Sequence, residues 1–339
     1  MPPGPSKKGY NFVVIKSAKG MKVLVVGTGS IGRRHILNLS SLGADVSAFS
    51  YRAAEGTMEA SQLGVPVLTD LANALNGDFD AVVVANRTDL HMEVALLAAR
   101  GKKHLFLEKP LSLSLDHCDD LMTLAEDNDL VVESGFMLRL HPNLVWIKRY
   151  LEKGSLGSLM YLRAAVGQWL PDWRPNTDYR GCYSAFRSMG GGVIFDLIHD
   201  LDLVRWLAGP VVEVSSMIRH VERLDIETEA IAQIGLRLQS DVLAQVHLDY
   251  VRPNYGRTLE IVGTLGILFW DYTAGTVLLI RGDGSREVVH RVPEGFERNT
   301  MFIEYMEYFL RRIESPGLEP VSSLVDGIES LRIDRKSVV

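Results

Sequence analysis

M-K-V-L-V-V-G-T-G-S-I-G-R-R-H, at residues 21–35, is the stretch that decides the fold. Its apolar run, Val23 to Val26, is typical of a strand buried on both faces, and it leads directly into a glycine-rich turn and an expected helix. In such a turn, Gly27 permits the tight bend, Gly29 lets a pyrophosphate approach the backbone, and Gly32 lets the helix pack against the strand. The free N–H groups at the helix N-terminus attract the anion.

This pattern predicts a dinucleotide-binding turn, because a strand precedes the glycines and a helix follows them. An ordinary strand-to-helix turn is the alternative, since glycine-rich turns are common. The cofactor contacts expected here are six consecutive residues: Gly27, Thr28, Gly29, Ser30, Ile31 and Gly32.

Length and composition limit the classes of protein to consider. A chain of 339 residues exceeds one typical core, so we expect two domains. Its 47% hydrophobic and 23% charged residues are typical of a soluble globular protein. The net charge of -6 argues against a nucleic-acid or anionic-membrane partner, and no apolar run approaches the ~20 residues of a membrane helix.

The cysteines point to a reducing compartment. Cys118 and Cys182 are the only two, too few for a disulfide framework and wrongly spaced for a structural zinc site. We therefore expect no metal and a cytoplasmic location. Residues 1–20 contain only a short apolar patch among lysines, which we interpret as a flexible tail.

Further apolar runs follow the first helix, at residues 44–49, 80–85, 103–107 and 130–135. They alternate with helix-forming segments, which predicts an α/β fold with a doubly wound parallel sheet. Ligands of such sheets bind beyond the carboxyl ends of the strands. The polar residues expected to face that crevice are Asn86, Thr88, His91, Glu108 and Lys109.

The end of the second run bears on the choice of cofactor. NAD-binding sheets commonly carry an acidic residue there, which holds the ribose 2′-OH. Here the tip reads Ser50-Tyr51-Arg52, with a hydroxyl and a guanidinium but no carboxylate. These groups suit a 2′-phosphate, so we expect NADP, bound in part by Ser50 and Arg52. NAD is the alternative. In that case Arg52 would be solvated or stacked on adenine, and Glu55 would bind the ribose.

β-rich runs dominate the chain after residue 159. Their density and the short turns between them, such as Gly282 to Gly284, predict one large, mostly antiparallel sheet in an α+β domain. The runs lie at residues 160–167, 211–221, 229–238, 242–251, 258–262, 267–272 and 276–280.

A proline-rich loop, Q-W-L-P-D-W-R-P at residues 168–175, lies between the first two of these runs, and D-Y-R follows at 178–180. Its aromatic and cationic side chains suit an aromatic floor and an anion clamp for a sugar derivative. A loop that only covers hydrophobic surface is the alternative. The candidate substrate residues are Trp169, Trp173, Arg174 and Tyr179.

Acidic residues surround a histidine on the helix expected after Gly190-Gly191-Gly192. At ~100° per residue, Asp196, His199 and Asp200 share one arc, with Asp202 on the other flank of His199. Such a cluster is costly to bury without a purpose, which indicates a functional site. The alternative is an acidic helix start that only complements the helix dipole.

Together, five segments resemble the glucose-fructose oxidoreductase / inositol dehydrogenase / MocA-like (Gfo/Idh/MocA) family of oxidoreductases. They occur in that family's order between residue 21 and about residue 207. The resemblance implies a Rossmann domain at residues 21–140, then a substrate-binding and oligomerisation domain at residues 141–339, in a homo-oligomer such as a dimer or tetramer. The segments are V-V-G-T-G-S-I-G-R-R-H, A-N-R-T-D-L-H-M-E-V-A, F-L-E-K-P-L-S, S-G-F-M-L-R-L-H-P and G-G-G-V-I-F-D-L-I-H-D-L-D.

The resemblance also implies roles for individual residues. It makes Lys109 of E-K-P the active-site lysine, with Glu108 orienting it or a ribose hydroxyl, and it places Arg139 at the border of the substrate pocket. His141 is a weaker candidate there. The chemistry agrees for Lys109, because an ammonium at a strand end can hold the reacting oxygen and stabilise its developing charge.

The spacing around the histidine departs from the family's commonest form. There the catalytic histidine follows the aspartate by four residues, whereas His199 follows Asp196 by three. The spacing from His199 to Asp202 is kept. Either the helix is shifted so that His199 still takes the proton, or Asp200 occupies the usual histidine position. We favour His199, with Asp196 and Asp202 orienting its ring and raising its basicity.

These features predict an NAD(P)-dependent oxidoreductase that acts on a sugar, amino sugar, nucleotide sugar or cyclitol. His199 would take the hydroxyl proton and Lys109 would steady the oxygen, while the nicotinamide accepts the hydride. Two alternatives stay open: a glycoside-cleaving enzyme that oxidises its substrate transiently, and a non-catalytic NAD(P)-binding sensor.

Overall fold

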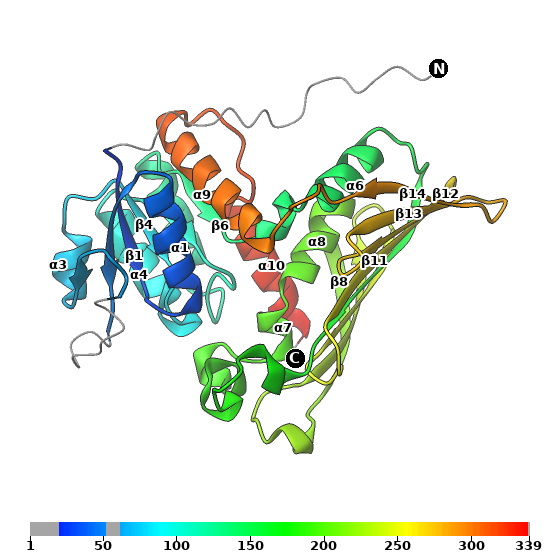
Figure 1. Ribbon diagram of the computed structural model, residues 1–339, viewed down its shortest axis with the longest axis horizontal. Helices are drawn as coiled ribbons and strands as arrows, with labels where there is room; N and C mark the ends of the chain where they lie inside the picture. The colour runs from blue at the N-terminus through cyan, green and yellow to red at the C-terminus, as the bar shows by residue number, and fades with distance from the viewer. Residues whose placement is uncertain (1–19, 52–61, 338–339) are drawn as a thin grey trace.

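The computed structural model describes residues 20–51 and 62–337, which form two packed domains (Figure 1). Arg52 and Glu55, on which the choice of cofactor depends, lie outside the described residues. The expected tail lies outside them as well, except for Gly20. No helix within the described ranges has both the length and the apolar content of a membrane span.

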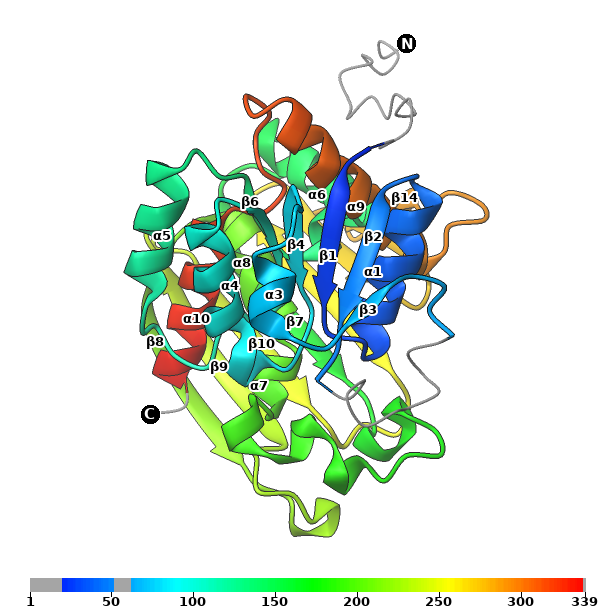
Figure 2. The same cartoon turned by 90° about the vertical axis from the view of Figure 1, so that its left-hand side faces the viewer.

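The first sheet is parallel throughout, in the order β3-β2-β1-β4-β5-β6 (Figure 2). It confirms the predicted doubly wound sheet. β3 was not expected, because so short a strand leaves no periodicity in the sequence. The strands are β1 (Lys22–Val26), β2 (Asp45–Phe49), β3 (Val67–Leu68), β4 (Ala81–Val84), β5 (His104–Leu107) and β6 (Val132–Ser134).

Helices cover both faces of this sheet, which explains the unbroken apolar run in β1. Val23 and Val25 belong to one buried core, together with apolar residues of α1 and α9. Leu24 and Val26 belong to a second core, together with residues of α4, α5 and α10. The helices are α1 (Ser30–Ser41), α3 (Leu71–Leu75), α4 (His91–Arg100), α5 (Cys118–Asp127), α9 (Arg298–Glu314) and α10 (Leu324–Ser337).

The second sheet has the order β14-β13-β12-β11-β7-β10-β9-β8. Only β7 and β10 pair in parallel, so the prediction of a mostly antiparallel sheet is confirmed. β14 was not expected, because this edge strand is largely exposed and carries mixed charges. The strands are β7 (Leu159–Gly167), β8 (Val211–Arg219), β9 (Ile231–Leu238), β10 (Leu243–Asp249), β11 (Gly256–Gly263), β12 (Gly266–Asp271), β13 (Thr276–Ile280) and β14 (Arg286–Arg291).

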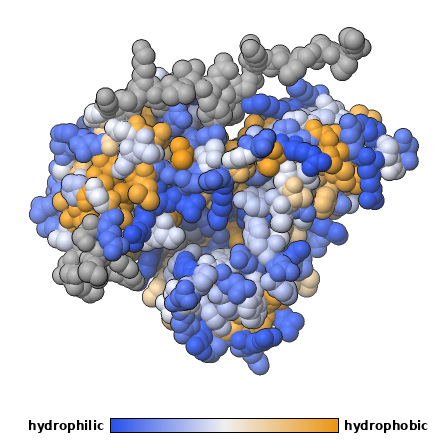
Figure 3. Space-filling view, in the orientation of Figure 1, coloured by the Kyte–Doolittle hydropathy of each residue, from blue (hydrophilic) through white to orange (hydrophobic). Residues whose placement is uncertain are grey.

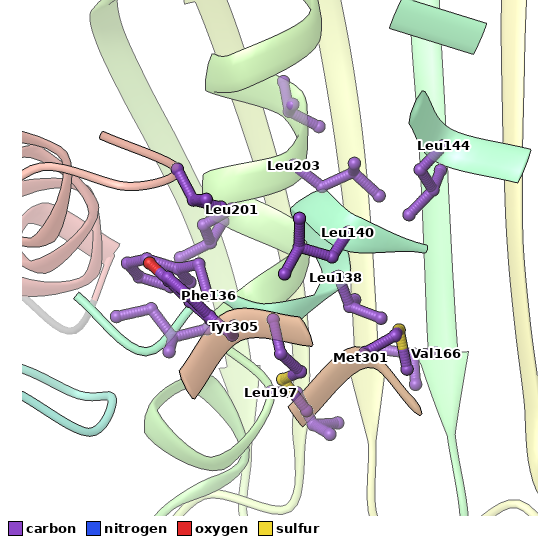
Figure 4. Packing of buried hydrophobic residues seen from close by; sticks show 14 of the residues in the cluster. Phe136, Leu138, Leu140, Leu144, Val166, Leu197, Leu201, Leu203, Met301 and Tyr305 are labelled. Atoms are coloured by element: carbon purple, nitrogen blue, oxygen red, sulfur yellow. The ribbon is translucent and has the colours of Figure 1, made fainter. Parts of the chain in front are cut away.

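The junction between the sheets is a continuous hydrophobic core. Side chains from the 136–144 segment, from α8 (His199–Ala208) and from α9 gather there, with Val166 of β7 beside them (Figure 4). The segment contains η3 (Met137–Leu140) and then the start of α6 (Pro142–Glu152). Because this core joins both domains, it fixes the two walls of the crevice relative to each other.

The C-terminal part of the chain returns to the first domain. The Ser134 N–H of β6 donates to the Ser322 carbonyl at 2.8 Å, and Ile328 and Leu331 of α10 are buried in the first domain's core. α9 starts between the two domains and then runs along the first one (Figure 1). Its first residues therefore lie near the crevice.

Candidate active site

The glycine turn joins β1 to α1 and leaves the start of α1 open. Gly29 is the N-cap; no side chain caps the helix, and its first turn holds no acidic residue. A Cβ at Gly27 would lie 2.6 Å from the Ala85 carbonyl oxygen, and one at Gly32 would overlap the Gly27 carbonyl oxygen. A Cβ at Gly29 would meet nothing within 4 Å, which leaves space above the free N–H groups for a pyrophosphate.

Asn86 follows β4 at the same edge of the sheet, beside the turn. Both polar atoms of its side-chain amide are buried and find no hydrogen-bond partner in the described part of the chain. Buried amides are ordinarily paired. An unpaired amide next to an open helix N-terminus is what a bound dinucleotide would satisfy, so the residues present fit this cofactor.

Thr28 and Ser50 connect the turn to the end of β2. The Thr28 hydroxyl donates to the Ser50 hydroxyl at 3.0 Å, and Ser50 is buried. Ser50 therefore lies at the strand end where a ribose is expected. Ser30 is exposed and Ile31 half-buried, in the first turn of α1.

His91 and Thr88, also expected in the crevice, are both buried. The two ring nitrogens of His91 lie 2.9 Å from the Pro110 carbonyl oxygen and 3.1 Å from that of Asn86, so His91 joins the loops after β4 and β5. Burial lowers the pKa of His91. Thr88 packs against Gly190, where a Cβ would lie 2.6 Å from the Thr88 Cβ. These two side chains shape the crevice, instead of pointing freely into it as expected.

Lys109 stands at the end of β5, before a cis peptide bond to Pro110. Its Nζ donates to the backbone carbonyl of Asp196 at 2.6 Å, across the junction between the domains. Burial lowers the pKa of Lys109, while the neighbouring Asp196 and Glu108 carboxylates act in the opposite direction. The ammonium is thus held at the crevice from both walls.

Glu108 has two partners. Its Oε1 lies 2.6 Å from Nε2 of His35 on α1, and its Oε2 accepts the Lys109 backbone N–H at 3.2 Å. Both the His35 and Glu108 side chains are almost fully buried. This carboxylate therefore connects the cofactor helix to the lysine strand, which agrees with the expectation that Glu108 orients Lys109.

The helix expected after Gly192 is interrupted, so the assumption of one continuous helix was wrong. α7 (Val193–Asp196) ends at Asp196, Leu197 and Ile198 form a short break, and α8 begins at His199. The break changes the rotation between Asp196 and His199. The directions of these two side chains therefore do not follow the ~100° rotation per residue of one regular helix.

The carboxylates of these helices each pair with a group other than His199. Oδ2 of Asp196 accepts the Tyr250 hydroxyl at 2.6 Å, and Oδ2 of Asp200 accepts Nη2 of Arg257 at 3.0 Å. Burial raises the pKa of Asp200, against the effect of Arg257. The expectation that Asp196 and Asp202 orient the histidine ring is thus not met.

Asp202 and Arg139 form a buried, two-bond ion pair. Nη2 and Nε of Arg139 donate to Asp202 at 2.6 and 3.0 Å, and Nη1 donates to the Val321 carbonyl and to Asp326 at 3.0 and 3.1 Å. The guanidinium is fully engaged in joining α8 to the start of α10. Arg139 thus joins these elements, and its expected place at the border of the substrate pocket stays a prediction.

His199 is buried, and neither ring nitrogen has a partner in the described residues. Its ring meets the edge of Phe136, with centroids 5.7 Å apart. Burial lowers the pKa of His199 well below its ordinary value, and the positive charges of Lys109, Arg257 and Arg298 lower it further. The predicted increase in basicity was therefore wrong, because cations surround the ring and no carboxylate reaches it. A lowered pKa favours the neutral form of the imidazole.

The residues of the proline-rich loop divide into two groups. Trp173 packs its edge on Tyr250, with centroids 5.3 Å apart, and the Arg174 guanidinium lies 4.9 Å from the Tyr183 ring centre. Burial, together with the charge of Asp196, raises the pKa of Tyr183, so this group adjoins the site.

The second group, Tyr179 and Trp169, contacts residues 223 and 224. The Tyr179 hydroxyl donates to the Leu224 carbonyl at 3.0 Å, and Trp169 lies beneath Arg223 at 5.4 Å. These two side chains cover hydrophobic surface, as in the alternative interpretation of the loop.

Three residues near the site were missed at the level of sequence: His35, Tyr250 and Arg257. His35 ends the quoted glycine stretch, three residues after Gly32, and its position there was the available signal. Tyr250 and Arg257 lie at the end of β10 and in β11 and meet α7 and α8 only through the fold, so no local pattern marks them.

Sequence comparison connects this geometry to known proteins. Residues 21–136 match the Gfo/Idh/MocA domain described as "Oxidoreductase family, NAD-binding Rossmann fold", and residues 144–269 match the "GFO/IDH/MocA C-terminal domain". The chain belongs to the Gfo/Idh/MocA oxidoreductase family. The two matches, in this order, cover well over half of the chain.

Relatives of this Gfo/Idh/MocA protein include dehydrogenases and reductases. The chain is 28% identical to the myo-inositol 2-dehydrogenase of Thermotoga maritima over 324 residues. This alignment covers 91% of this chain and 92% of that protein. The chain is also 26% identical over 319 residues to the 1,5-anhydro-D-fructose reductase of Ensifer adhaerens. That alignment likewise covers 91% of this chain and 92% of the other protein.

The fold resembles that of levoglucosan dehydrogenase in complex with NADH. The TM-score is 0.84 at 20% identity, over 94% of this chain and 96% of the other. The predicted family, fold class and enzyme class are thus confirmed: the protein is an oxidoreductase with a nicotinamide-dinucleotide-binding Rossmann domain. The preference for NADP over NAD stays a prediction.

Proposed function

We propose that this oxidoreductase transfers a hydride between a nicotinamide cofactor and a hydroxyl-bearing carbon of a sugar, amino sugar, nucleotide sugar or cyclitol. One observation carries the proposal: Lys109 of the Rossmann domain reaches the Asp196 carbonyl of the second domain, next to a buried His199 whose ring nitrogens have no partner within residues 20–51 and 62–337. The relatives named above act on cyclitol and sugar compounds, and they support this class of substrate.

The chain's own residues supply the proton chemistry. Lys109 donates a hydrogen bond to the reacting oxygen and stabilises negative charge on it. His199 takes the hydroxyl proton on one of its ring nitrogens, neither of which has a hydrogen-bond partner in the described residues. Asp196 holds Lys109 through its carbonyl and Tyr250 through its carboxylate, and is therefore a positioning residue. When bound, the nicotinamide accepts the hydride, or returns it in the direction of reduction.

We infer that the dinucleotide lies along the carboxyl edge of the first sheet. The open start of α1 binds the pyrophosphate, and the Asn86 amide donates to or accepts from the cofactor. We keep the preference for NADP on the sequence Ser50-Tyr51-Arg52, which offers no carboxylate to a ribose. The division into residues 21–140 and 141–339 assigns the cofactor to the first part and the substrate mainly to the second.

We also infer a homo-oligomer that assembles through the open face of the second sheet. The strand registers place the exposed side chains of Tyr161, Leu243 and Met217 on the same face. Exposed apolar side chains grouped on one face favour association. Light scattering tests this: a mass equal to one chain contradicts it. Cys118 and Cys182 are both free thiols, which supports a cytoplasmic location.

A thermal-shift comparison of NADP with NAD, followed by a panel of sugars, nucleotide sugars and cyclitols, tests the function. We expect NADP to raise the melting temperature more than NAD, and at least one compound of the panel to change nicotinamide absorbance. A glycoside-cleaving enzyme would consume a glycoside without net absorbance change, and a sensor would bind cofactor without turnover. A protein that binds neither dinucleotide contradicts the proposal.

A further inference from the structure

Arginines from three separate elements surround the candidate active site. Arg34 lies on α1, Arg257 on β11, and Arg298 is the first residue of α9. The guanidinium carbons of Arg34 and Arg298 lie 4.6 and 6.0 Å from the centre of one ring, that of Phe302. Two like charges therefore share one neighbour at the side where α9 starts between the domains (Figure 1).

Arg257 brings a third cation to this side, and it is buried. Its Nη2 pairs with Asp200, the residue directly after His199, while its Nε is buried without a hydrogen-bond partner in the described residues. Buried guanidinium N–H groups ordinarily find acceptors. Both Arg257 and Arg298 lower the pKa of Lys109 and of His199, which agrees with their closeness to the reacting groups.

The carboxylates near these cations are already engaged. Asp200 pairs with Arg257, Glu108 pairs with His35, and the Asp196 carboxylate accepts a tyrosine hydroxyl. Within residues 20–51 and 62–337, Arg34 and Arg298 form no ion pair with any carboxylate. Burial, and then the nearby charge of Arg298, lower the Arg34 pKa, while the Glu108 carboxylate acts in the opposite direction.

The start of α9 adds to this excess of positive charge. Glu297 at the N-cap makes no side-chain cap, and the first turn of this 17-residue helix holds no acidic residue. The Thr300 N–H donates to the Glu297 carbonyl at 3.0 Å, which leaves the N–H groups of Arg298 and Asn299 available to an anion. Hydrophilic residues flank the indentation between the two domains on the face where α9 begins (Figure 3).

We propose that Arg34, Arg257, Arg298 and the start of α9 form an anion subsite, which binds a carboxylate or phosphate carried by the substrate. Guanidinium groups match these anions in charge and geometry, and of the three only Arg257 has a carboxylate partner in the described residues. The inference rests on the proposed function and narrows its substrate class to acidic sugars, sugar phosphates and nucleotide sugars.

Calorimetric titration of the full chain tests the subsite, both without cofactor and with it. Three probes share one ring and differ in charge: D-glucose, D-glucuronate and D-glucose 6-phosphate. We expect at least one anionic probe to bind about tenfold or more tightly than glucose, as for one added charged hydrogen bond, and raised salt to reduce the difference. The better of the two anions distinguishes a carboxylate from a phosphate source.

Arg298→Gln removes one cation of the subsite without breaking an ion pair of the described structure. It should reduce the anion preference at least about fivefold, consistent with the loss of most of one charged hydrogen bond. Arg311→Gln, on the last turn of the same helix, is the matched control and should keep the preference within about twofold.

The outcomes separate this inference from the proposed function. If the parent protein binds no anionic probe better than glucose, or binds none of the three, the anion subsite is wrong even when NADP or NAD binds. If Arg298→Gln keeps the full preference, the arginine cluster is not its source. Failure of both dinucleotides to bind contradicts the proposed function, whereas the cofactor-free titration still decides the subsite.

Discussion

Nε2 of His35 lies 2.6 Å from Oε1 of Glu108. The contact connects α1, whose N-terminus is the proposed pyrophosphate site, to the residue before Lys109. The rings of Phe106 and Phe302 meet the His35 ring at centroid distances of 5.3 and 6.1 Å and fix its direction. We therefore expect this buried pair to couple the position of α1 to that of Lys109.

Replacement of His35 by leucine should leave Glu108 buried without its partner. We expect kcat to fall about 10- to 100-fold with a smaller change in KM for the cofactor, as for other supporting residues of catalytic groups. His35→Gln retains an N–H donor at the same reach and should restore much of kcat. Steady-state kinetics of the two variants checks this, and parental kcat in His35→Leu refutes the positioning role.

The Arg139–Asp202 pair should act on stability. Arg139→Met leaves the Asp202 carboxylate buried and unpaired, which costs about 3–5 kcal/mol of unfolding free energy. The double variant Arg139→Met, Asp202→Leu should recover a large part of that loss. Urea unfolding measures both. A variant that instead keeps its stability and raises the substrate KM would return Arg139 to the substrate pocket.

His141 should make stability depend on pH. Burial, with the charges of Arg257 and His290, lowers its pKa from 6.5 to about 3, and its Nδ1 accepts the Asn143 N–H at 3.2 Å. Between these values the unfolded chain binds the proton that the folded chain excludes. The unfolding free energy therefore falls as pH decreases from about 6.5, by at most about 1.4 kcal/mol per pH unit for this residue.

The variant His141→Asn tests that slope, because asparagine keeps an N-cap acceptor and does not titrate. Urea unfolding at several pH values should show a shallower decrease than in the parent, whatever the variant's absolute stability. The same substitution at the exposed His117 is the control. Equal slopes in the His141 variant and the parent would show that another group causes the pH dependence.

Two glycines of the turn should respond differently to alanine. At Gly29 a Cβ meets nothing within 4 Å and φ is -68°, so Gly29→Ala should fold normally and lose about tenfold or more in dinucleotide affinity, because the methyl group occupies the pyrophosphate's approach. Gly32→Ala should destabilise the fold itself, since its Cβ overlaps the Gly27 carbonyl. Melting curves with and without dinucleotide distinguish the two. Parental affinity in Gly29→Ala would place the pyrophosphate elsewhere.

Elements with a strong local pattern were predictable from the sequence. The apolar run Val23 to Val26 predicts a strand buried on both faces, and the structure buries it so. The structure also leaves no space for a Cβ at Gly27 or Gly32, as the glycine pattern predicts. β3 and β14 were not predictable, because one is too short for a pattern and the other is an exposed, charged edge.

The sequence indicated candidate site residues, but it did not indicate their hydrogen-bond partners. Lys109 and His199 were identified, yet the partners of the acidic residues come from distant strands: Tyr250 and Arg257 have no local signature. The break after Asp196 also escaped prediction. Carboxylates were expected to raise the basicity of His199. Instead, burial and the nearby cations lower its pKa.

The central claim is that Lys109, held against the Asp196 carbonyl, stabilises the reacting oxygen during hydride transfer. The most direct measurement compares turnover and dinucleotide affinity of Lys109→Met with those of the parent, using a substrate found in the panel. The account predicts turnover reduced at least about a hundredfold, the usual effect of losing a group that stabilises developing charge, with dinucleotide affinity within about threefold of the parent. Parental turnover in Lys109→Met would contradict it.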